Sequence, residues 1–125
     1  GNSFRNVVRL SVAIDGTALN VLVTHLDRSN DSERCRQLAA VAGLFLALAE
    51  PAVLMGDLNS GPDEPALQQL IATPGVDDPL RHLNAEQGRT RIDWILTRGL
   101  KCHDRGAIDT GASDHPCYWV DAEIR

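Results

Sequence analysis

The chain has 125 residues, a formal net charge of −5 and 43% hydrophobic residues, a composition typical of an ordinary globular domain. The acidic balance disfavours capture of nucleic acid by bulk positive charge. An acidic chain can still act on phosphates, because a divalent cation bound by carboxylates can supply the local positive charge. The longest apolar stretch, from Leu38 to Ala49, is too short to span a bilayer, so no membrane span is predicted.

The cysteines and the first residues carry little chemical information. Cys35, Cys102 and Cys117 are odd in number and widely spaced, which favours free thiols over a disulfide framework or a zinc site. Residues 1–6 lack the charged and apolar regions of a signal peptide. This slightly favours an intracellular location, and secretion stays open because the natural N-terminus can lie upstream.

The first half of the chain predicts a strand hairpin, a helix and a buried strand. Apolar residues alternate over 8–14 and again over 18–26, with turn residues between them. The capping-box spacing of Asn30 and Glu33 and a helical apolar period predict a helix of roughly 18 residues ending near Glu50. The apolar run 52–55 after Pro51 is typical of a strand buried on both faces.

The second half predicts one more helix and three more strands. A helix is expected from Pro65 to about Ala72, followed by a loop over 73–89. Strands are expected over 91–96, 100–108 and 117–124. Helices mixed with strands in this order predict a mixed sheet with helices, of α/β or α+β layering.

Four short segments place polar residues at the ends of these strands. Ligands of sheet proteins bind near such ends, so a convergent site is expected, although each segment alone is weak support for one. The segments are Thr24-His25-Leu26, Gly56-Asp57-Leu58-Asn59-Ser60, Arg91-Ile92-Asp93-Trp94 and Ser113-Asp114-His115-Pro116.

Spacing excludes two familiar sites. The run that begins at Asp57 resembles the start of an EF-hand loop, but Pro62 and Gln68 occupy the positions where that loop needs Gly and a bidentate Glu. The sequence also lacks the G-x-S-x-G elbow of a serine hydrolase. Neither a calcium loop nor a nucleophilic serine is predicted.

Taken together and in this order, the four segments resemble the second half of the endonuclease/exonuclease/phosphatase superfamily. That superfamily includes pancreatic deoxyribonuclease, abasic-site endonucleases, sphingomyelinases and inositol polyphosphate 5-phosphatases. The resemblance implies hydrolysis of a phosphoester by in-line attack of water, with Mg²⁺ or Mn²⁺ as cofactor. It leaves the substrate open among nucleic acid, a lipid head group and a small phosphodiester.

The resemblance also implies a role for each polar side chain. Asp57 would orient and deprotonate the water, and Asn59 would hold a phosphate oxygen or the metal. His115 would bind the phosphate and stabilise the transition state, paired with Asp93, which favours the charged imidazolium. His25 would bind the phosphate or assist the leaving group. The spacing of Asp57 and Asn59 places both side chains on one side of an extended loop.

The implied metal ligands are Asp114, directly or through water, together with Asp57 and Asn59. These are hard oxygen donors, which suit Mg²⁺ because this ion keeps several of its own waters. The superfamily's principal metal ligand is a Glu in its first half, which has no counterpart here. We therefore expect this chain alone to bind Mg²⁺ weakly and to be weakly active or inactive.

The superfamily fold is a four-layer αββα sandwich. The resemblance implies that residues 1–125 form its C-terminal half, with the N-terminal half absent from this chain. This half would be an α+β (mixed α/β) unit with one mixed, mostly antiparallel sheet and helices on one face. A sheet with helices on one face would then expose its other apolar face. A complementary N-terminal half or self-association is expected to cover it. Two other interpretations stay open: a noncatalytic association module that retains the fold, and an unrelated α/β domain with accidental motifs.

Overall fold

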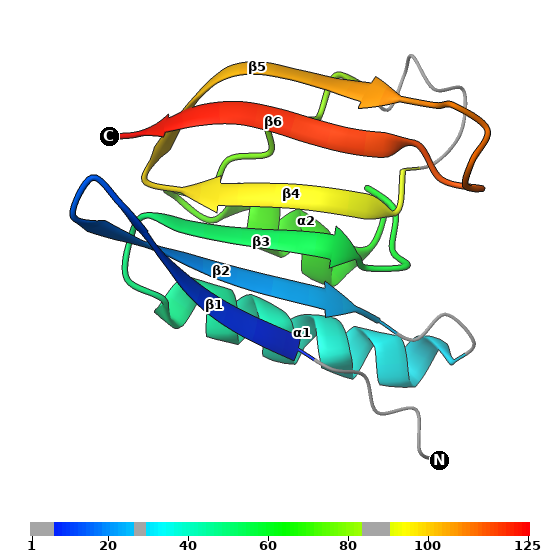
Figure 1. The fold of residues 1–125 in the computed structure, drawn as a ribbon. Coiled ribbons are helices and arrows are strands. Elements are labelled where there is room, and N and C mark those ends of the chain that lie inside the picture. The colour runs from blue at the N-terminus through cyan, green and yellow to red at the C-terminus, as the bar shows by residue number, and fades with distance from the viewer. Residues whose placement is uncertain (1–6, 27–29, 84–90) are drawn as a thin grey trace.

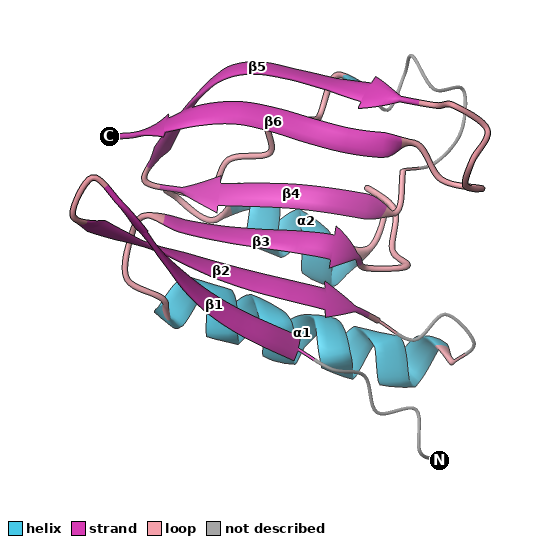
Figure 2. Cartoon of the chain, viewed as in Figure 1, coloured by secondary structure: helices cyan, strands magenta, loops and turns pink. Residues whose placement is uncertain are grey.

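The computed structural model describes residues 7–26, 30–83 and 91–125 (Figure 1). Residues 1–6, in which no leader was found, lie outside the described residues, as does the part of the expected loop beyond residue 83. Strands dominate the described part of the chain (Figure 2). In chain order the elements are β1 (Val7–Ile14), β2 (Thr17–His25), α1 (Asp31–Ala47), β3 (Ala52–Asp57), α2 (Pro65–Ala72), β4 (Asp93–Arg98), β5 (Leu100–Ile108) and β6 (Cys117–Ile124).

The strands form a mixed four-stranded sheet and a separate hairpin. The sheet has the order β1-β2-β3-β4, in which β2 and β3 run parallel and the other pairs run antiparallel. The mixed sheet and the α+β class are confirmed. The strands β5 and β6 pair only with each other, where a single sheet was expected. Gly99, with φ of 75°, turns the chain between β4 and β5 and lets the hairpin leave the plane of the sheet.

Both helices pack on one face of the four-stranded sheet, as expected (Figure 1). Leu22 of β2, Leu54 of β3 and Leu96 of β4 are buried on this face and form one core cluster with residues of α1 and α2. Among the helix residues, Phe45 and Leu67 are fully buried. Apolar side chains that recur every two residues along the strands therefore pack against those that recur every 3.6 residues along the helices, in one apolar layer.

The helix ends follow from local chemistry. The side chain of Asn30 accepts a hydrogen bond of 3.0 Å from the backbone N–H of Glu33, so it caps α1 as predicted. The helix ends at Ala47, a little before the expected Glu50. Pro65 begins α2, where its missing N–H costs nothing.

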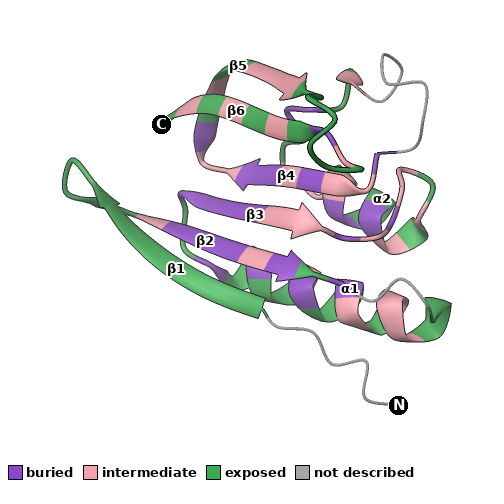
Figure 3. Ribbon diagram, turned by 45° about the vertical axis from the view of Figure 1, so that its right-hand side comes forward, coloured by how far each residue is buried: buried purple, intermediate pink, exposed green. Residues whose placement is uncertain are grey.

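The opposite face of the sheet is apolar and only partly covered. Val21 and Val53 are buried there with Leu100, the first residue of β5. The edge strand β1 is exposed along its whole length (Figure 3). Its residue Leu10, which pairs with Val21, is 46% exposed. Within the described ranges, every helix is too short or too polar to cross a membrane.

Candidate active site

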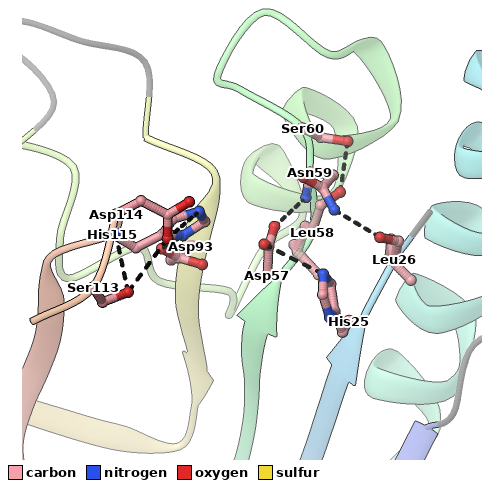
Figure 4. A network of polar contacts seen from close by, with 10 residues as sticks. All are labelled: His25, Leu26, Asp57, Leu58, Asn59, Ser60, Asp93, Ser113, Asp114 and His115. Atoms are coloured by element: carbon pink, nitrogen blue, oxygen red, sulfur yellow. Dashed lines mark hydrogen bonds and ion pairs between the residues drawn. The ribbon is translucent and has the colours of Figure 1, made fainter. Parts of the chain in front are cut away.

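Three polar side chains stand side by side at one end of the sheet (Figure 4). His25 ends β2, Asp57 ends β3, and Asp93 begins β4. The strand register pairs His25 with Asp57 and Asp57 with Asp93. His25 Nε2 lies 3.5 Å from Asp57 Oδ2. The register of the central strands therefore brings together residues that three of the four motifs supply.

Gly56 allows the end of β3 to lie against β2. It has φ of 140°, and a Cβ placed on it would lie 1.9 Å from the carbonyl oxygen of Thr24. Any side chain at this position would push β3 away from β2, and with it Asp57 away from His25. Gly56 was not predicted from the sequence to have a role of its own. A glycine inside a strand pattern, just before a carboxylate, is the signal that could have revealed it.

Residues 57–59 form a tight turn, which corrects the expectation of an extended loop. Asn59 has φ of 45°, a left-handed conformation that asparagine tolerates. Its backbone N–H donates to Asp57 Oδ1 at 2.8 Å, and its Nδ2 donates to the carbonyl oxygen of Leu26 at 2.7 Å. The turn is closed by the carboxylate of Asp57 and tied to the end of β2. Sequence spacing did not reveal the turn because the left-handed residue is not a glycine.

The Asp93 carboxylate holds the imidazole of His115. His115 Nδ1 lies 2.7 Å from Asp93 Oδ2, which is the pairing that the motifs led us to expect. This hydrogen bond is the main cause of a pKa of His115 above the ordinary histidine value. Burial raises the pKa of Asp93, and the hydrogen bond from His115 opposes that effect. The pair favours an imidazolium beside a carboxylate.

The loop before β6 brings Ser113 and Asp114 to the same place. The backbone N–H of His115 donates to Ser113 Oγ at 3.2 Å. The side chain of Asp114 is 92% exposed, and its Oδ1 lies 4.0 Å from His115 Nε2. Asp114 is therefore close to the imidazole, with its carboxylate directed largely into solvent.

One cleft of about 770 Å³ collects the predicted site residues. Its lining includes apolar residues of β3 and β4 as well as the polar ends of the strands. All six predicted side chains line it: His25, Asp57, Asn59, Asp93, Asp114 and His115. Motifs that are up to 90 residues apart thus converge, which is contrary to the interpretation of an unrelated domain with accidental motifs.

Metal-ligating atoms also meet in this cleft. Among the described residues, Asp57, Asp93 and His115 each offer a ligand atom, and these atoms lie within 4.8 Å of one another. Asp114 does not belong to this group. His115 Nδ1 is already engaged by Asp93, so the carboxylate oxygens are the donors of this group that remain for a cation.

A family comparison agrees with this geometry. The model of the endonuclease/exonuclease/phosphatase family matches residues 2–115. The chain belongs to the endonuclease/exonuclease/phosphatase family. The resemblance expected from the four motifs is thereby confirmed. A search of curated proteins found no match.

Solved structures of other proteins share the fold of this family member. The human Nocturnin catalytic domain with bound sulfate is 16% identical, with a TM-score of 0.72 over 97% of this chain and 53% of that one. Zebrafish TDP2 in complex with a single-strand DNA product is 20% identical, with a TM-score of 0.68 over 94% and 58%. A mannosyl-6-phosphatase from Bacteroides thetaiotaomicron is 18% identical, with a TM-score of 0.64 over 87% and 52%. The chain thus spans about half the length of the structures it matches.

Proposed function

We propose that this chain carries the catalytic half-site of a divalent-metal-dependent phosphoesterase that activates water for in-line attack. The observation that carries the proposal is the convergence of all six predicted polar side chains on one cleft. Membership of a family of phosphoesterases gives the reaction class.

Asp57 is the proposed general base. One of its carboxylate oxygens, Oδ1, accepts the backbone N–H of Asn59 and is therefore fixed in direction. The other, Oδ2, faces His25 and the cleft. The Asp57 side chain is 18% exposed, so an attacking water could reach this second oxygen. A carboxylate within hydrogen-bond reach of such a water can orient it and accept its proton.

His115 is the proposed electrostatic stabiliser of the phosphate. Asp93 engages Nδ1, which leaves Nε2 as the nitrogen that can donate to a phosphate oxygen. Because the hydrogen bond to Asp93 raises the pKa of His115, the imidazolium is favoured where negative charge develops. Asp93 thus acts on the substrate through His115.

Asn59 and His25 complete the proposed phosphate site. Asn59 Nδ2 is directed to the carbonyl oxygen of Leu26, and this fixes the orientation of the amide. Its amide oxygen is then directed away from Leu26 and is suited to a cation. The side chain of His25 is 63% exposed beside Asp57, where it could reach a phosphate oxygen or a leaving group.

The residues fit a hard divalent cation such as Mg²⁺ or Mn²⁺. Asp57, Asn59 and Asp114 line the same cleft and supply carboxylate and amide oxygens, the ligands that these ions prefer. These three residues would hold the ion, with Asp114 acting through water in view of its exposure. When bound, the ion would counter the negative charge on the phosphate.

The proposed partner is a second apolar β-sheet layer, the complementary half of the domain. The outward residues of β1 remain 41–48% exposed, and together they extend the apolar face formed by β2 and β3: Val8, Leu10, Val12 and Ile14. Exposed apolar faces of this extent mark interaction surfaces. Self-association through the same face is the alternative.

The proposed substrate is a phosphoester, of nucleic acid, of a lipid head group or of a small molecule. The site residues contact only a phosphate group in this scheme, so they do not select among these sources. The neighbours named above agree with phosphate chemistry: one holds a sulfate, one a single-strand DNA product, and one is named as a sugar phosphatase.

The decisive experiment is hydrolysis of bis(4-nitrophenyl) phosphate by the full-length protein, with Mn²⁺ and after chelation. We expect metal-dependent turnover, and we expect Asp57→Asn to reduce kcat by at least about 100-fold. The matched control is Asp63→Asn, which changes an exposed carboxylate outside the cleft. Turnover that survives Asp57→Asn or chelation contradicts the proposal. Absence of turnover in the wild type favours a noncatalytic association module.

A further inference from the structure

The strand that carries Asp93 begins next to a buried ion pair. Arg91 Nη2 lies 2.9 Å and 3.1 Å from the two carboxylate oxygens of Asp78. The side chains are 0% and 5% exposed. Arg91 Nε and Nη1 have no hydrogen-bond partner among the described residues. An unpaired buried donor costs stability, so this ion pair is poorly explained as a stabilising contact alone.

The guanidinium of Arg91 is stacked on the indole of Trp94. Its Cζ lies 3.8 Å from the ring centroid, and Trp94 is 1% exposed. The planar guanidinium suits such stacking, which a lysine ammonium cannot reproduce. The position of the indole within β4 is therefore set from one side by Arg91.

The indole also holds the turn that follows β3. Trp94 Nε1 donates a hydrogen bond of 2.8 Å to the carbonyl oxygen of Ser60. The backbone N–H of Leu58 donates to the carbonyl oxygen of Ile92 at 3.0 Å. Both bonds join the start of β4 to residues 57–60, which carry Asp57 and Asn59. The turn is therefore fixed against the strand that carries Asp93.

The segment around Asp78 is fixed by hydrogen bonds to β4 and β5. Its neighbour Asp77 exchanges backbone hydrogen bonds of 2.9 Å and 3.0 Å with Thr97, and its neighbour Pro79 accepts one from Arg105 Nη1 at 3.2 Å. The carboxylate that holds Arg91 thus stands on a segment fixed to β4 and β5. A chain of contacts runs from there through Arg91 and Trp94 to Ser60.

We propose that Arg91 is a positioning residue, which acts through Trp94 to set the turn bearing Asp57 and Asn59 relative to Asp93. This inference rests on the proposed phosphoesterase function for its catalytic consequence. Arg91 contacts neither Asp57 nor Asn59 directly. Displacement of the turn would separate the general base from the Asp93–His115 pair and would slow the chemical step with little effect on substrate binding.

The test compares Arg91→Lys with Arg98→Lys in the full-length protein. Arg98 is a matched control, because it lies at the other end of β4 and also faces an aromatic ring, that of Phe45, at 5.7 Å. Its hydrogen bonds go to carbonyl oxygens of Phe45 and Leu48 near the end of α1, away from the turn. It therefore controls for the loss of a partly buried arginine.

We expect Arg91→Lys to reduce kcat by about 10-fold or more, with KM changed by less than about 2-fold. We also expect the indole N–H of Trp94, assigned by its loss in Trp94→Phe, to exchange with solvent at least about 10-fold faster. Amides in the centre of β2 and β3 should keep their exchange rates. Arg98→Lys should change none of these quantities.

Uniform acceleration of exchange throughout the core, or none at Trp94, would overturn the positioning role. Trp94→Phe gives a second test, since it keeps an aromatic ring beside Arg91 and removes the bond to Ser60. It should lower kcat in the same way, and an unchanged kcat in an active protein contradicts the inference. If the wild type shows no turnover, the proposed function fails, while the Trp94 exchange rates still decide whether Arg91 fixes the turn.

Discussion

His115 and Asp93 are 22 positions apart in the sequence, and His115 Nδ1 lies 2.7 Å from Asp93 Oδ2. The contact links the loop before β6 to the first residue of β4. It ties the imidazole to the four-stranded sheet. The orientation of the proposed phosphate-binding nitrogen therefore depends on this carboxylate.

Replacement of Asp93 by Asn should lower the pKa of His115 towards the ordinary histidine value, because the hydrogen bond to the carboxylate is the main cause of its elevation. The measurement is an NMR pH titration of the imidazole carbon protons. Asp63→Asn is the control, since Asp63 is exposed and lies outside the cleft. An unchanged His115 titration in Asp93→Asn would show that the pair does not form in solution.

The same contact predicts how stability depends on pH. A histidine whose pKa is raised by folding binds its proton more tightly in the folded state, so its contribution is full below the ordinary pKa. That contribution is lost as the pH rises through the raised value. We expect the free energy of unfolding of the wild type, relative to His115→Gln, to increase between about pH 8 and about pH 6. Urea denaturation across this range provides the measurement, and a difference that is flat or of opposite slope contradicts it.

Gly56→Ala should destabilise the protein by at least about 2 kcal/mol, because a Cβ there would lie 1.9 Å from the carbonyl oxygen of Thr24. Gly43→Ala is a matched control within α1, where an added Cβ meets nothing within 4 Å. That substitution should stabilise by about 0.5–1 kcal/mol through helix propensity. Both values come from chemical denaturation. Equal effects at the two positions would show that β3 can move away from β2.

The helices and strands of this fold were predictable where apolar residues recur with one period along the whole element. The last strand and the helix that begins at Pro65 follow the apolar pattern directly. The pairing of strands was less accessible, because the pattern of β5 and β6 does not say whether they extend the main sheet. At Gly99 the chain turns between β4 and β5 through one left-handed backbone position.

The candidate site was predictable as a set of residues and not as a geometry. The order of the four motifs selected side chains that line one cleft. The turn at Asn59 depends on a contact with Leu26, which is 33 positions away in the sequence. The stacking of Arg91 on Trp94 was not predictable either, because an arginine three positions before a tryptophan gives no sign that both side chains are buried.

Asp114→Asn should weaken Mn²⁺ binding by roughly 10-fold, since it removes a charged ligand acting directly or through water. The unfolding free energy should change by less than about 0.5 kcal/mol, because the side chain is 92% exposed. Electron paramagnetic resonance of free Mn²⁺ gives the affinity, and Asp63→Asn serves as the control. Unaltered Mn²⁺ affinity would remove Asp114 from the proposed ligand set.

Leu10→Lys should abolish association through the outer sheet face while leaving the fold of the chain intact. Leu10 is 46% exposed on β1, so the unfolding free energy of the isolated chain should change by less than about 0.5 kcal/mol. A charge at the centre of a sheet-on-sheet contact would be desolvated without a partner and would weaken the contact strongly.

Leu44→Lys provides the matched control for this face, because Leu44 is 51% exposed on α1, which covers the opposite side of the sheet. Light scattering and sedimentation of the wild-type chain should show self-association or binding of a complementary sheet segment. Leu10→Lys should remove that association, and Leu44→Lys should not. A wild-type chain that remains monomeric and does not bind such a segment would show that the apolar face is stable in water without a cover. That outcome would contradict the proposal that the exposed apolar face of β1 and its neighbours is an interaction surface.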